Sequence, residues 1–248
     1  MEIIENYSFG EIIGKGGKGT VYKCKKLNKD YVIKKIKNEK NSLNEVYMME
    51  IVKDIPGVVK ILEYFEKNEN IFIVMEYLEN HLDLFDFISN VVRIKEDSAK
   101  IIFSQTLFSV EACFDRGIFP GDIKDENIII DIETLNSKLI DFGNSKKVSD
   151  EDYCHFHPTE VYSPPEWIQH KKCDKKLFTV WSLGILLFDM VIGDIPFKTR
   201  AQIKECNLDM LNKIDISENC KNLIRGCLEK KIQNRTKLED IKNHNWIK

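Results

Sequence analysis

A cluster of glycines near the start of the chain, at residues 14–19 (Gly-Lys-Gly-Gly-Lys-Gly), constrains the fold more than any other feature. Its G-x-G-x-x-G spacing occurs in two kinds of phosphate-binding fold, and the residues that follow it distinguish them. In a dinucleotide-binding fold the loop must open a helix whose N-terminus faces the pyrophosphate. Here the residues from Thr20 to Cys24 are β-branched and alternate in polarity, so the loop joins two strands. The pattern predicts a glycine-rich hairpin that covers nucleotide phosphates, with a plain hairpin turn as the alternative.

The rest of the chain divides into a strand-rich beginning and a helix-rich remainder. Strand patterns cover residues 7–14, 20–25, 31–36, 58–65 and 70–77. One helical pattern, 42–54, interrupts them after an expected Ser42 cap, and 96–114 is the clearest helix beyond Leu82. We therefore predict an α+β, bilobal fold in a single domain, 1–248. Its small antiparallel-sheet lobe with one helix covers about 1–77, a hinge about 76–80, and a larger, mainly helical lobe about 81–248.

Composition is that of a globular protein, with 43% hydrophobic and 31% charged residues and a net charge of −3 that gives no reason to expect nucleic-acid binding. The acidic start does not resemble a signal peptide, and the apolar run Val180–Ile192 is short for a membrane span and contains Asp189. Seven cysteines without a C-x-x-C pair indicate reduced thiols. We expect a monomer in the cytoplasm or nucleus (host-cell cytoplasm if the lysine-rich, AT-rich composition reflects a virus), without membrane or nucleic-acid partners.

A strand lysine and a helix carboxylate follow the glycine cluster. Lys34 stands 15 residues beyond Gly19, in Tyr31-Val32-Ile33-Lys34. Its expected role is to hold the α- and β-phosphates of a nucleotide while paired with a carboxylate on the next helix. Glu45 is the candidate partner, and Glu39 and Glu50 are alternatives that spacing leaves open.

The strongest chemical signal is a pair of motifs, Asp122-Ile123-Lys124-Asp125-Glu126-Asn127 and, 14 residues beyond Asn127, Asp141-Phe142-Gly143. Phosphoryl transfer needs an acid that orients the attacking hydroxyl and accepts its proton, which suits Asp122. It also needs oxygen ligands for Mg²⁺, which suits Asp141 and the amide of Asn127. Lys124 could neutralise the transferred phosphate. A lysine at this position is typical of enzymes that phosphorylate serine or threonine rather than tyrosine.

These motifs together identify a protein kinase, and further stretches resemble the PIM family of serine/threonine kinases from Tyr7 to Trp246. The stretches that carry the resemblance are 84–88 (LFDFI), 122–127 (DIKDEN), 138–143 (KLIDFG), 161–168 (VYSPPEWI) and 180–197 (VWSLGILLFDMVIGDIPF). Ser163-Pro164-Pro165-Glu166 stands where kinases carry A-P-E, and we expect Glu166 to pair with Arg235. The match leads us to expect that the whole chain is catalytic domain.

The resemblance implies ATP and Mg²⁺ as cofactors and basic, arginine-rich proteins as substrates, with activity independent of activation-loop phosphorylation. The residues that match ATP-binding positions are Gly14, Lys15, Gly16, Gly17, Gly19, Val21, Lys34, Glu76 and Leu78. The residues that match substrate-binding positions are Asp83, Asp86, Asp125, Glu126, Thr159, Asp189 and Asp194. Leu78 replaces a family proline and should restore a hydrogen-bond donor to adenine.

Several departures from the family pattern bear on activity. Pro120-Gly121-Asp122 replaces H-R-D, so the arginine that contacts a phosphorylated activation loop is absent. We expect Pro120 to loosen Phe142 and Gly121 to add backbone freedom beside the base. Val32 should crowd adenine, Glu160 replaces an arginine next to the substrate, and residues 198–200 (Lys-Thr-Arg) replace an acidic run. The leading hypothesis is an active serine/threonine kinase; the alternatives are a pseudokinase that binds nucleotide or a partner, a small-molecule phosphotransferase, and an oxidoreductase.

Overall fold

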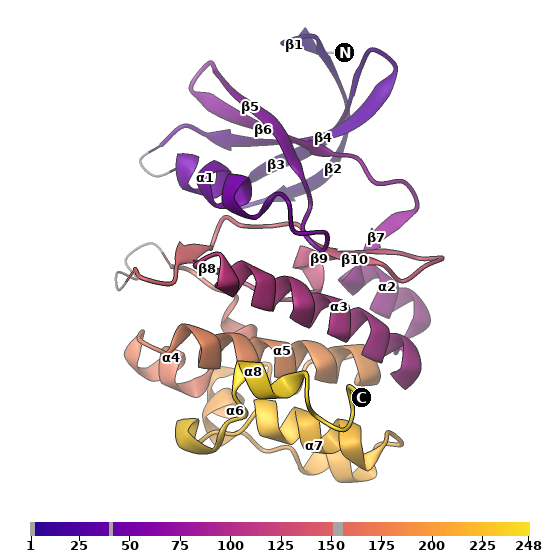
Figure 1. Cartoon of the computed structure of the whole chain (residues 1–248), viewed down its shortest axis with the longest axis vertical. Coiled ribbons are helices and arrows are strands. Elements are labelled where there is room, and N and C mark those ends of the chain that lie inside the picture. Colours follow the sequence, from indigo (N-terminus) through magenta and orange to yellow (C-terminus); the bar gives the residue numbers. More distant parts are fainter. Residues whose placement is uncertain (1–2, 40–41, 151–155) are drawn as a thin grey trace. The chain divides into compact units, whose positions relative to one another are not determined.

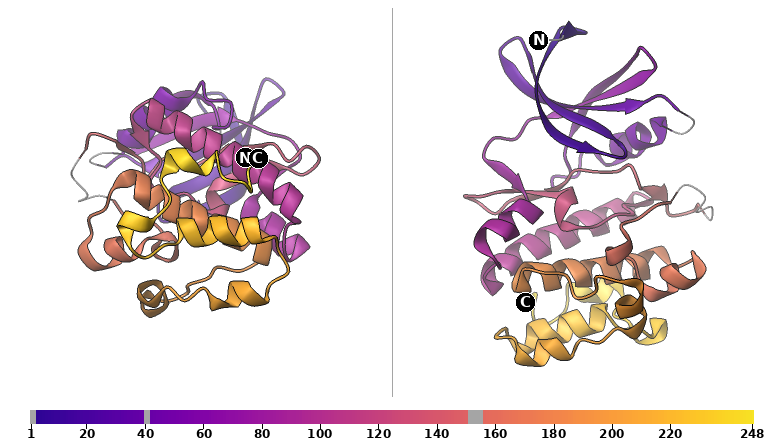
Figure 2. Two further views of the ribbon diagram at one scale, coloured as in Figure 1. Left: turned by 60° about the horizontal axis from the view of Figure 1, so that its bottom comes forward. Right: turned by 180° about the vertical axis from the view of Figure 1, so that it is seen from behind.

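A computed structural model describes residues 3–39, 42–150 and 156–248, and these fall into two compact units, residues 1–79 and 80–248 (Figure 1). The first unit is a six-stranded antiparallel sheet in the order β1-β2-β3-β4-β6-β5, with one helix. Its elements are β1 (Ile3–Ile4), β2 (Tyr7–Gly16), β3 (Gly19–Lys26), β4 (Lys29–Lys37), α1 (Leu43–Val52), β5 (Ile61–Lys67) and β6 (Asn70–Glu76). The sheet is curled, and irregular register in β2 between Phe9 and Gly14 accompanies the curl (Figure 2).

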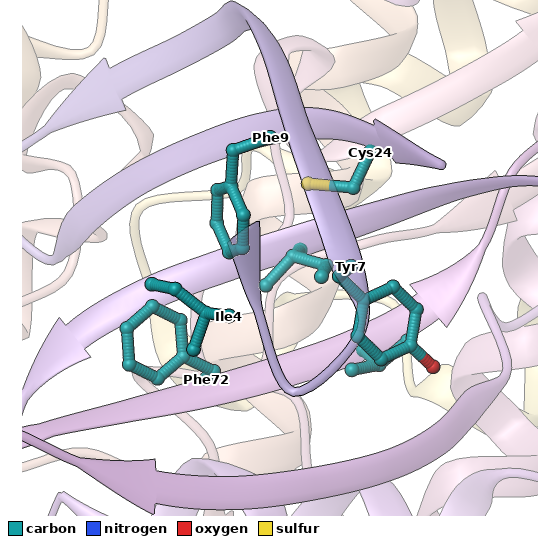
Figure 3. Close-up of a cluster of buried hydrophobic side chains, with 7 residues drawn as sticks. Ile4, Tyr7, Phe9, Cys24 and Phe72 are labelled. Carbon is teal, nitrogen blue, oxygen red and sulfur yellow. The ribbon is translucent and has the colours of Figure 1, made fainter. Parts of the chain in front are cut away.

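An aromatic core holds the curled sheet together. It contains Tyr7 and Phe9 from β2, Cys24 from β3 and Phe72 from β6 (Figure 3). Tyr7 meets the ring of Tyr31 edge-on at 5.3 Å between centroids, and Phe9 meets that of Phe72 at 5.9 Å. These aromatic residues stand at alternating positions of their strands, so one face of the β2–β3 hairpin is anchored in the core.

The expected strands and the single helix of this unit are present, with two differences. The strand expected over 58–65 begins only at Ile61, and Val58 and Val59 are buried in the connection that precedes it. Ser42 occupies the N-cap position of α1, as expected, but among the described residues its hydroxyl makes no cap hydrogen bond to the helix. That oxygen instead accepts a hydrogen bond from the backbone N–H of Glu39 at 2.9 Å, and this bond closes the turn before the helix.

The second unit is mainly helical, with α3 and α5 at its centre and α7 and α8 packed on α5 (Figure 1). Its helices are α2 (Leu84–Val91), α3 (Glu96–Asp115), α4 (Pro165–His170), α5 (Lys175–Ile192), α6 (Arg200–Glu205), α7 (Glu218–Cys227) and α8 (Leu238–Ile241), with single 3-10 turns η1 (Asp125–Asn127), η2 (Glu160–Tyr162), η3 (Asp209–Lys213) and η4 (Ile232–Asn234). Its short strands are β7 (His81–Asp83), β8 (Ile118–Phe119), β9 (Ile128–Asp131), β10 (Ser137–Leu139) and β11 (Lys146–Lys147).

Helix α5 forms the core of the second unit because it is apolar on nearly every face, and 14 of its residues are buried. The Asp174 carboxylate caps its start by accepting a hydrogen bond from the N–H of Leu177 at 2.8 Å. Gly193 ends it with φ +84°, at a point where a Cβ would lie 1.8 Å from the carbonyl oxygen of Val92. In the described ranges, no helix is both long enough and apolar enough to cross a membrane.

Two small antiparallel sheets of this unit position the segments that contain Asp122 and Asp141. Strands β10, β9 and β7 form one of them, in that order, and β9 follows directly on η1. The second sheet pairs β8 with β11, so that Ile118 lies opposite Lys147 and Phe119 opposite Lys146. The segments before Asp122 and after Gly143 are therefore held side by side.

Candidate active site

In the first unit, Lys34 on β4 and Glu45 on α1 form a buried ion pair, with Nζ and Oε1 2.5 Å apart. Both side chains are nearly inaccessible, with exposed fractions of 11% and 7%. The other two candidate carboxylates have different neighbours: Glu50 pairs with Lys53 at 2.8 Å, and Glu39 lies in the turn before α1. A lone buried charge would be costly, so the two partners hold each other in place.

The glycine cluster forms the turn between β2 and β3, with Gly16 opposite Gly19 and Lys15 opposite Thr20. Gly19 is required by the protein's own packing, because at its φ of +142° a Cβ would lie 2.4 Å from the carbonyl oxygen of Lys35. At Gly16 and Gly17 a Cβ would meet no atom of the described residues within 4 Å. Internal packing therefore does not explain glycine at these two positions, whereas close approach of a phosphate would.

The remaining ATP-site candidates of this unit lie on β3 and around the end of β6. Val21 stands opposite Gly14 in the hairpin and opposite Lys34 on the next strand. Glu76 donates its backbone N–H to the carbonyl oxygen of Lys60 at 3.0 Å and accepts the N–H of Lys60 on its carboxylate at 2.9 Å. Leu78 follows in the segment without regular structure that ends the unit.

In the second unit, the carboxylate of Asp122 is buried, and side-chain and backbone N–H groups surround it. Its Oδ1 accepts the backbone N–H of Thr159 at 3.0 Å, and its Oδ2 accepts the amide of Asn144 at 3.1 Å. The amide of Asn127 lies 3.4 Å from the same Oδ2 and donates to the Asp122 carbonyl oxygen at 2.8 Å. The side chain expected to act as the base is therefore fixed from several directions.

Gly121 corrects one expectation from the sequence. Its φ is +81°, and a Cβ there would lie 2.2 Å from the carbonyl oxygen of Asn144, so the glycine serves a close backbone approach. The preceding residue, Pro120, is fixed as well: its carbonyl oxygen accepts the hydroxyl of Ser145 at 2.8 Å. Phe142 is fully buried. The structure thus shows a tightly packed turn where we expected backbone freedom and a loosened Phe142.

Lys124 follows Asp122 by two residues and forms an ion pair with the carboxylate of Glu126. Burial lowers the pKa of its amine, but the hydrogen bond to Glu126 and the nearby charge of Asp122 outweigh this, and the pKa lies above its ordinary value. Lys124 therefore keeps its positive charge, and one of the acids expected to bind substrate, Glu126, already has a cationic neighbour.

The two candidate magnesium ligands, Asn127 and Asp141, come from neighbouring segments. The Ile140 N–H donates to the carbonyl oxygen of Asn127 at 3.1 Å, which places the residue before Asp141 beside Asn127. Since the Asn127 amide nitrogen faces Asp122, its oxygen is the atom suited to a cation. The carboxylate of Asp141 accepts the N–H of Gly143 at 2.9 Å, which orients it. An amide oxygen and a carboxylate are ligands that Mg²⁺ accepts, with substrate phosphates completing its shell.

Four of the acids expected to bind substrate gather around η1. Asp83 caps α2 by accepting the N–H of Asp86 at 2.7 Å. Burial raises the pKa of the Asp83 carboxyl, and the charges of Asp86, Asp125 and Glu126 raise it further. The structure thus brings these four acids, which span more than 40 positions of sequence, within mutual electrostatic range.

The other two acids extend the group toward α5. Asp189 is 5% exposed, and burial, followed by the neighbouring charge of Asp125, raises the pKa of its carboxyl to about 7. Asp194, beyond the end of α5, adds to this effect. Asp194 also pairs with Lys198 at 2.5 Å, and Arg200 pairs with Glu160 at 2.6 Å. The two basic residues of 198–200 are therefore each paired with a nearby acid of this chain.

The expected ion pair between Glu166 and Arg235 is confirmed, and it is bidentate, with N–O distances of 2.7 and 3.1 Å. The Arg235 side chain is fully buried, lies over the ring of Trp181 at 5.0 Å and also donates to the carbonyl oxygens of Leu177 and Glu229. The pair joins α4 to the segment between η4 and α8.

Phe156 anchors the segment that follows residue 155. Its ring lies 4.9 Å from that of Trp167 and 5.4 Å from that of Phe119, inside a buried cluster that also contains Phe178. Three residues later, Thr159 reaches the base through its backbone N–H. None of the six cysteines within the described residues forms a disulfide, and Cys154 lies outside them.

Comparison with known proteins gives one family over nearly the whole chain. Residues 7–247 match the family described as "Protein kinase domain". The chain is 35% identical to the serine/threonine-protein kinase pim-2 of Danio rerio, with 98% of this chain and 85% of that protein aligned. It is 32% identical to prk-2 of Caenorhabditis elegans (98% and 58%) and 30% identical to serine/threonine-protein kinase 1 of African swine fever virus (94% and 77%).

Proposed function

Because the chain belongs to the protein kinase family, with PIM-like serine/threonine kinases among its relatives, we propose that it transfers the γ-phosphate of ATP to serine or threonine residues of basic, arginine-rich proteins. The observation that carries this proposal is the buried, multiply hydrogen-bonded carboxylate of Asp122. Although Pro120-Gly121 replaces His-Arg, the carboxylate of the proposed base is held by several hydrogen bonds. The packing of this turn therefore compensates for the sequence change that argued most strongly against an active kinase.

In the proposed reaction, the substrate hydroxyl oxygen bonds to the γ-phosphorus, the bond from that phosphorus to the β–γ bridging oxygen breaks, and ADP leaves. Asp122 orients the hydroxyl and accepts its proton. Lys124, held positive by Glu126, balances charge on the transferred phosphoryl group. Mg²⁺, held by Asn127 and Asp141, would neutralise charge on the phosphates.

The nucleotide-binding part of the proposal rests on residues of the first unit. Lys34, fixed by Glu45, would bind the α- and β-phosphates. The open sides of Gly16 and Gly17 leave room for phosphate oxygens, and backbone groups at Glu76 and Leu78 would bind adenine. These roles come from the family match and the local geometry taken together.

Preference for basic substrates is supported by the acids around η1 and α5. Like charges that raise one another's pKa are relieved when a cation binds among them, and an arginine side chain supplies such a cation. Because Lys198 already pairs with Asp194, we propose that Asp83, Asp86, Asp125 and Asp189 contribute more to arginine recognition than Asp194 does. Cysteines without disulfides support the proposal of a cytoplasmic or nuclear location, and we propose a monomer.

The test is phosphate transfer from Mg-ATP to an arginine-rich serine peptide, with Asp122→Asn and Lys34→Met proteins run in parallel. Exposed residues provide matched controls, Asp209→Asn and Lys25→Met, which should keep the native rate. Transfer by the native chain that only the first two substitutions abolish supports the proposal. If none of these proteins, the native chain included, transfers phosphate while ATP still binds, the pseudokinase hypothesis replaces this proposal.

A further inference from the structure

A short antiparallel pairing joins the residues just before Asp122 to those just after Asn144, and contacts continue from it toward Asp122. Ile118 and Phe119 lie opposite Lys147 and Lys146, and the Val148 N–H donates to the Gly117 carbonyl oxygen at 2.8 Å. The same register, continued toward Asp122, sets Pro120 opposite Ser145 and Gly121 opposite Asn144. The contacts at both positions agree with this register: the Ser145 hydroxyl donates to the Pro120 carbonyl oxygen, and the Gly121 backbone packs against the Asn144 carbonyl.

This register brings the side chain of Asn144 against the base. Asn144 is 4% exposed, and its amide nitrogen donates to the Asp122 carboxylate at 3.1 Å and to the carbonyl oxygen of His157 at 3.0 Å. An amide nitrogen carries two hydrogens, and both are used. The opposite amide orientation would place an oxygen against two acceptors, so the contacts themselves fix which atom faces the base.

We infer that Asn144 is a positioning residue that links the base Asp122 to the segment after residue 155, at His157, and takes the place of an arginine–phosphate contact. In kinases with H-R-D the arginine precedes the base and reaches a phosphorylated loop; here that position is Gly121, which has no side chain. Here the buried amide of Asn144 connects the base to the segment after residue 155, and this contact needs no phosphorylation. The inference rests on the proposed function only in taking Asp122 as the base.

Gly121 and Asn144 act together in this arrangement. Any side chain at position 121 would meet the Asn144 carbonyl oxygen, with a Cβ at 2.2 Å, and would push the Asn144 backbone away. The glycine therefore permits the close approach that brings the amide to Asp122. The N–H of Thr159, which donates to the other carboxylate oxygen, completes a second connection between base and segment.

The kinetic test uses Asn144→Ala and the nearly isosteric Asn144→Asp, which places a carboxylate oxygen where the amide nitrogen donates. We expect kcat to fall about 10- to 100-fold in the first and further in the second, because a misplaced base transfers the proton poorly, while the Kd of Mg-ATP stays within about twofold. Ser145→Ala is the matched control: it removes a buried hydrogen bond to the Pro120 carbonyl oxygen and keeps the Asn144 amide, and kcat should change by no more than about threefold.

A double mutant separates positioning from general loss of structure. If Asn144 acts through the Asp122 carboxylate, adding Asn144→Ala to Asp122→Asn should change the residual single-turnover rate by less than about twofold. An equal loss in the native and Asp122→Asn backgrounds would overturn the inference, as would an Asn144→Ala protein with native kcat.

Hydrogen exchange at the Thr159 amide tests the link without any activity. We expect exchange at this amide to be at least about tenfold faster in Asn144→Ala and Asn144→Asp proteins and unchanged in Ser145→Ala. Unchanged exchange in all three would refute the link. If the native chain transfers no phosphate, the proposed function fails, and the exchange result still decides whether Asn144 connects the two segments.

Discussion

At the scale of single residues, the tight turn at Gly121 determines how the catalytic loop can be built. The positive φ and the 2.2 Å gap between a would-be Cβ and the Asn144 carbonyl oxygen leave no room for a side chain. An L-residue there would carry backbone strain of about 1–3 kcal/mol in addition to the steric overlap. Gly121 and Pro120, which together replace His-Arg, therefore belong to the same tightly packed turn.

Restoring the common family sequence should therefore impair the protein. We expect Pro120→His combined with Gly121→Arg to lower kcat at least about tenfold and to lower Tm, because the arginine forces Asn144 off the base. Steady-state kinetics and thermal unfolding of the native and double-substituted proteins measure both effects. Pro120→Ala alone keeps the glycine and serves as the control. A gain in rate on restoration would show that Pro120-Gly121 is a defect.

The metal assignment gives a second prediction at this scale. Asp141→Asn keeps the size of the side chain but removes the charge that would bind Mg²⁺. We expect the Mg²⁺ concentration needed for half-maximal ATP binding to rise at least about tenfold and transfer to be lost. Titration of nucleotide affinity against Mg²⁺ measures the first effect. Native Mg²⁺ dependence in the Asp141→Asn protein would remove Asp141 from the metal site.

The Glu166–Arg235 pair could be predicted, and Asp122, Lys124 and Asn127 could be proposed as catalytic residues, because the spacing of these motifs carries the signal. Asn144 could not, since its role depends on the register of two strands of two residues each, too short to leave a hydrophobic pattern. The same limit explains the misjudged Gly121, whose conformation is set by a backbone that lies 23 positions further along the chain.

At the scale of elements, helix α5 carries a buried acid whose titration affects stability. Burial first, and then the charge of Asp125, raises the pKa of Asp189 to about 7. The folded chain therefore binds a proton that the unfolded chain has released between about pH 4 and pH 7, so this group's contribution to stability is lost as pH rises through that window. Asp194 and Tyr162 also face this carboxyl.

We expect Asp189→Asn to be more stable than the native chain at pH 8 and to lose that advantage by pH 5, where the native carboxyl is neutral. Thermal unfolding of both proteins at several pH values measures the difference in Tm. Asp209→Asn, an exposed substitution outside the acidic group, is the control. A difference in Tm that does not change between pH 5 and pH 8 would contradict the assignment.

The Glu166–Arg235 pair is the element-scale contact with the largest expected effect on stability. Arg235→Met leaves a buried carboxylate without its partner, and we expect the free energy of unfolding to fall by about 3–5 kcal/mol. Arg235→Lys should also destabilise, because lysine cannot make the bidentate contact. Urea unfolding measures both. Lys176→Met, in an exposed pair with Glu239, should change stability by less than about 0.5 kcal/mol, and a loss at Arg235 no larger than this would make the buried pair unimportant.

At the scale of the whole molecule, the sequence was sufficient to predict the α+β class and most strands, because glycine punctuation and apolar alternation mark them. It did not predict how charges are distributed over the finished surface. From the sequence we interpreted Glu160 and Arg200 as two separate changes in substrate contacts. In the folded chain they form an ion pair, with a nitrogen of Arg200 2.6 Å from a carboxylate oxygen of Glu160. Pairing between residues 40 positions apart is a property of the fold and has no local signal.

Independence from activation-segment phosphorylation is the prediction that depends on the whole of the second unit. Three connections hold the segment after residue 155 without a phosphate: the Phe156 ring in its aromatic cluster, the Thr159 N–H on Asp122, and the Asn144 amide on His157. Position 121 has no arginine that a phosphate could engage. We expect protein treated with phosphatase, and shown to be unmodified by mass spectrometry, to keep kcat within about twofold of untreated protein.

The aromatic connection provides the matching loss-of-function variant. Phe156 is 2% exposed, and Phe156→Ala should cost about 3–5 kcal/mol of stability locally and release the segment, so that kcat falls in phosphorylated and unphosphorylated protein alike. Phe108→Ala, an exposed aromatic on α3, is the control with little expected effect. Loss of activity on phosphatase treatment, with recovery on rephosphorylation, would mean that these contacts are too weak to order the segment, and that a phosphate engages some group other than residue 121.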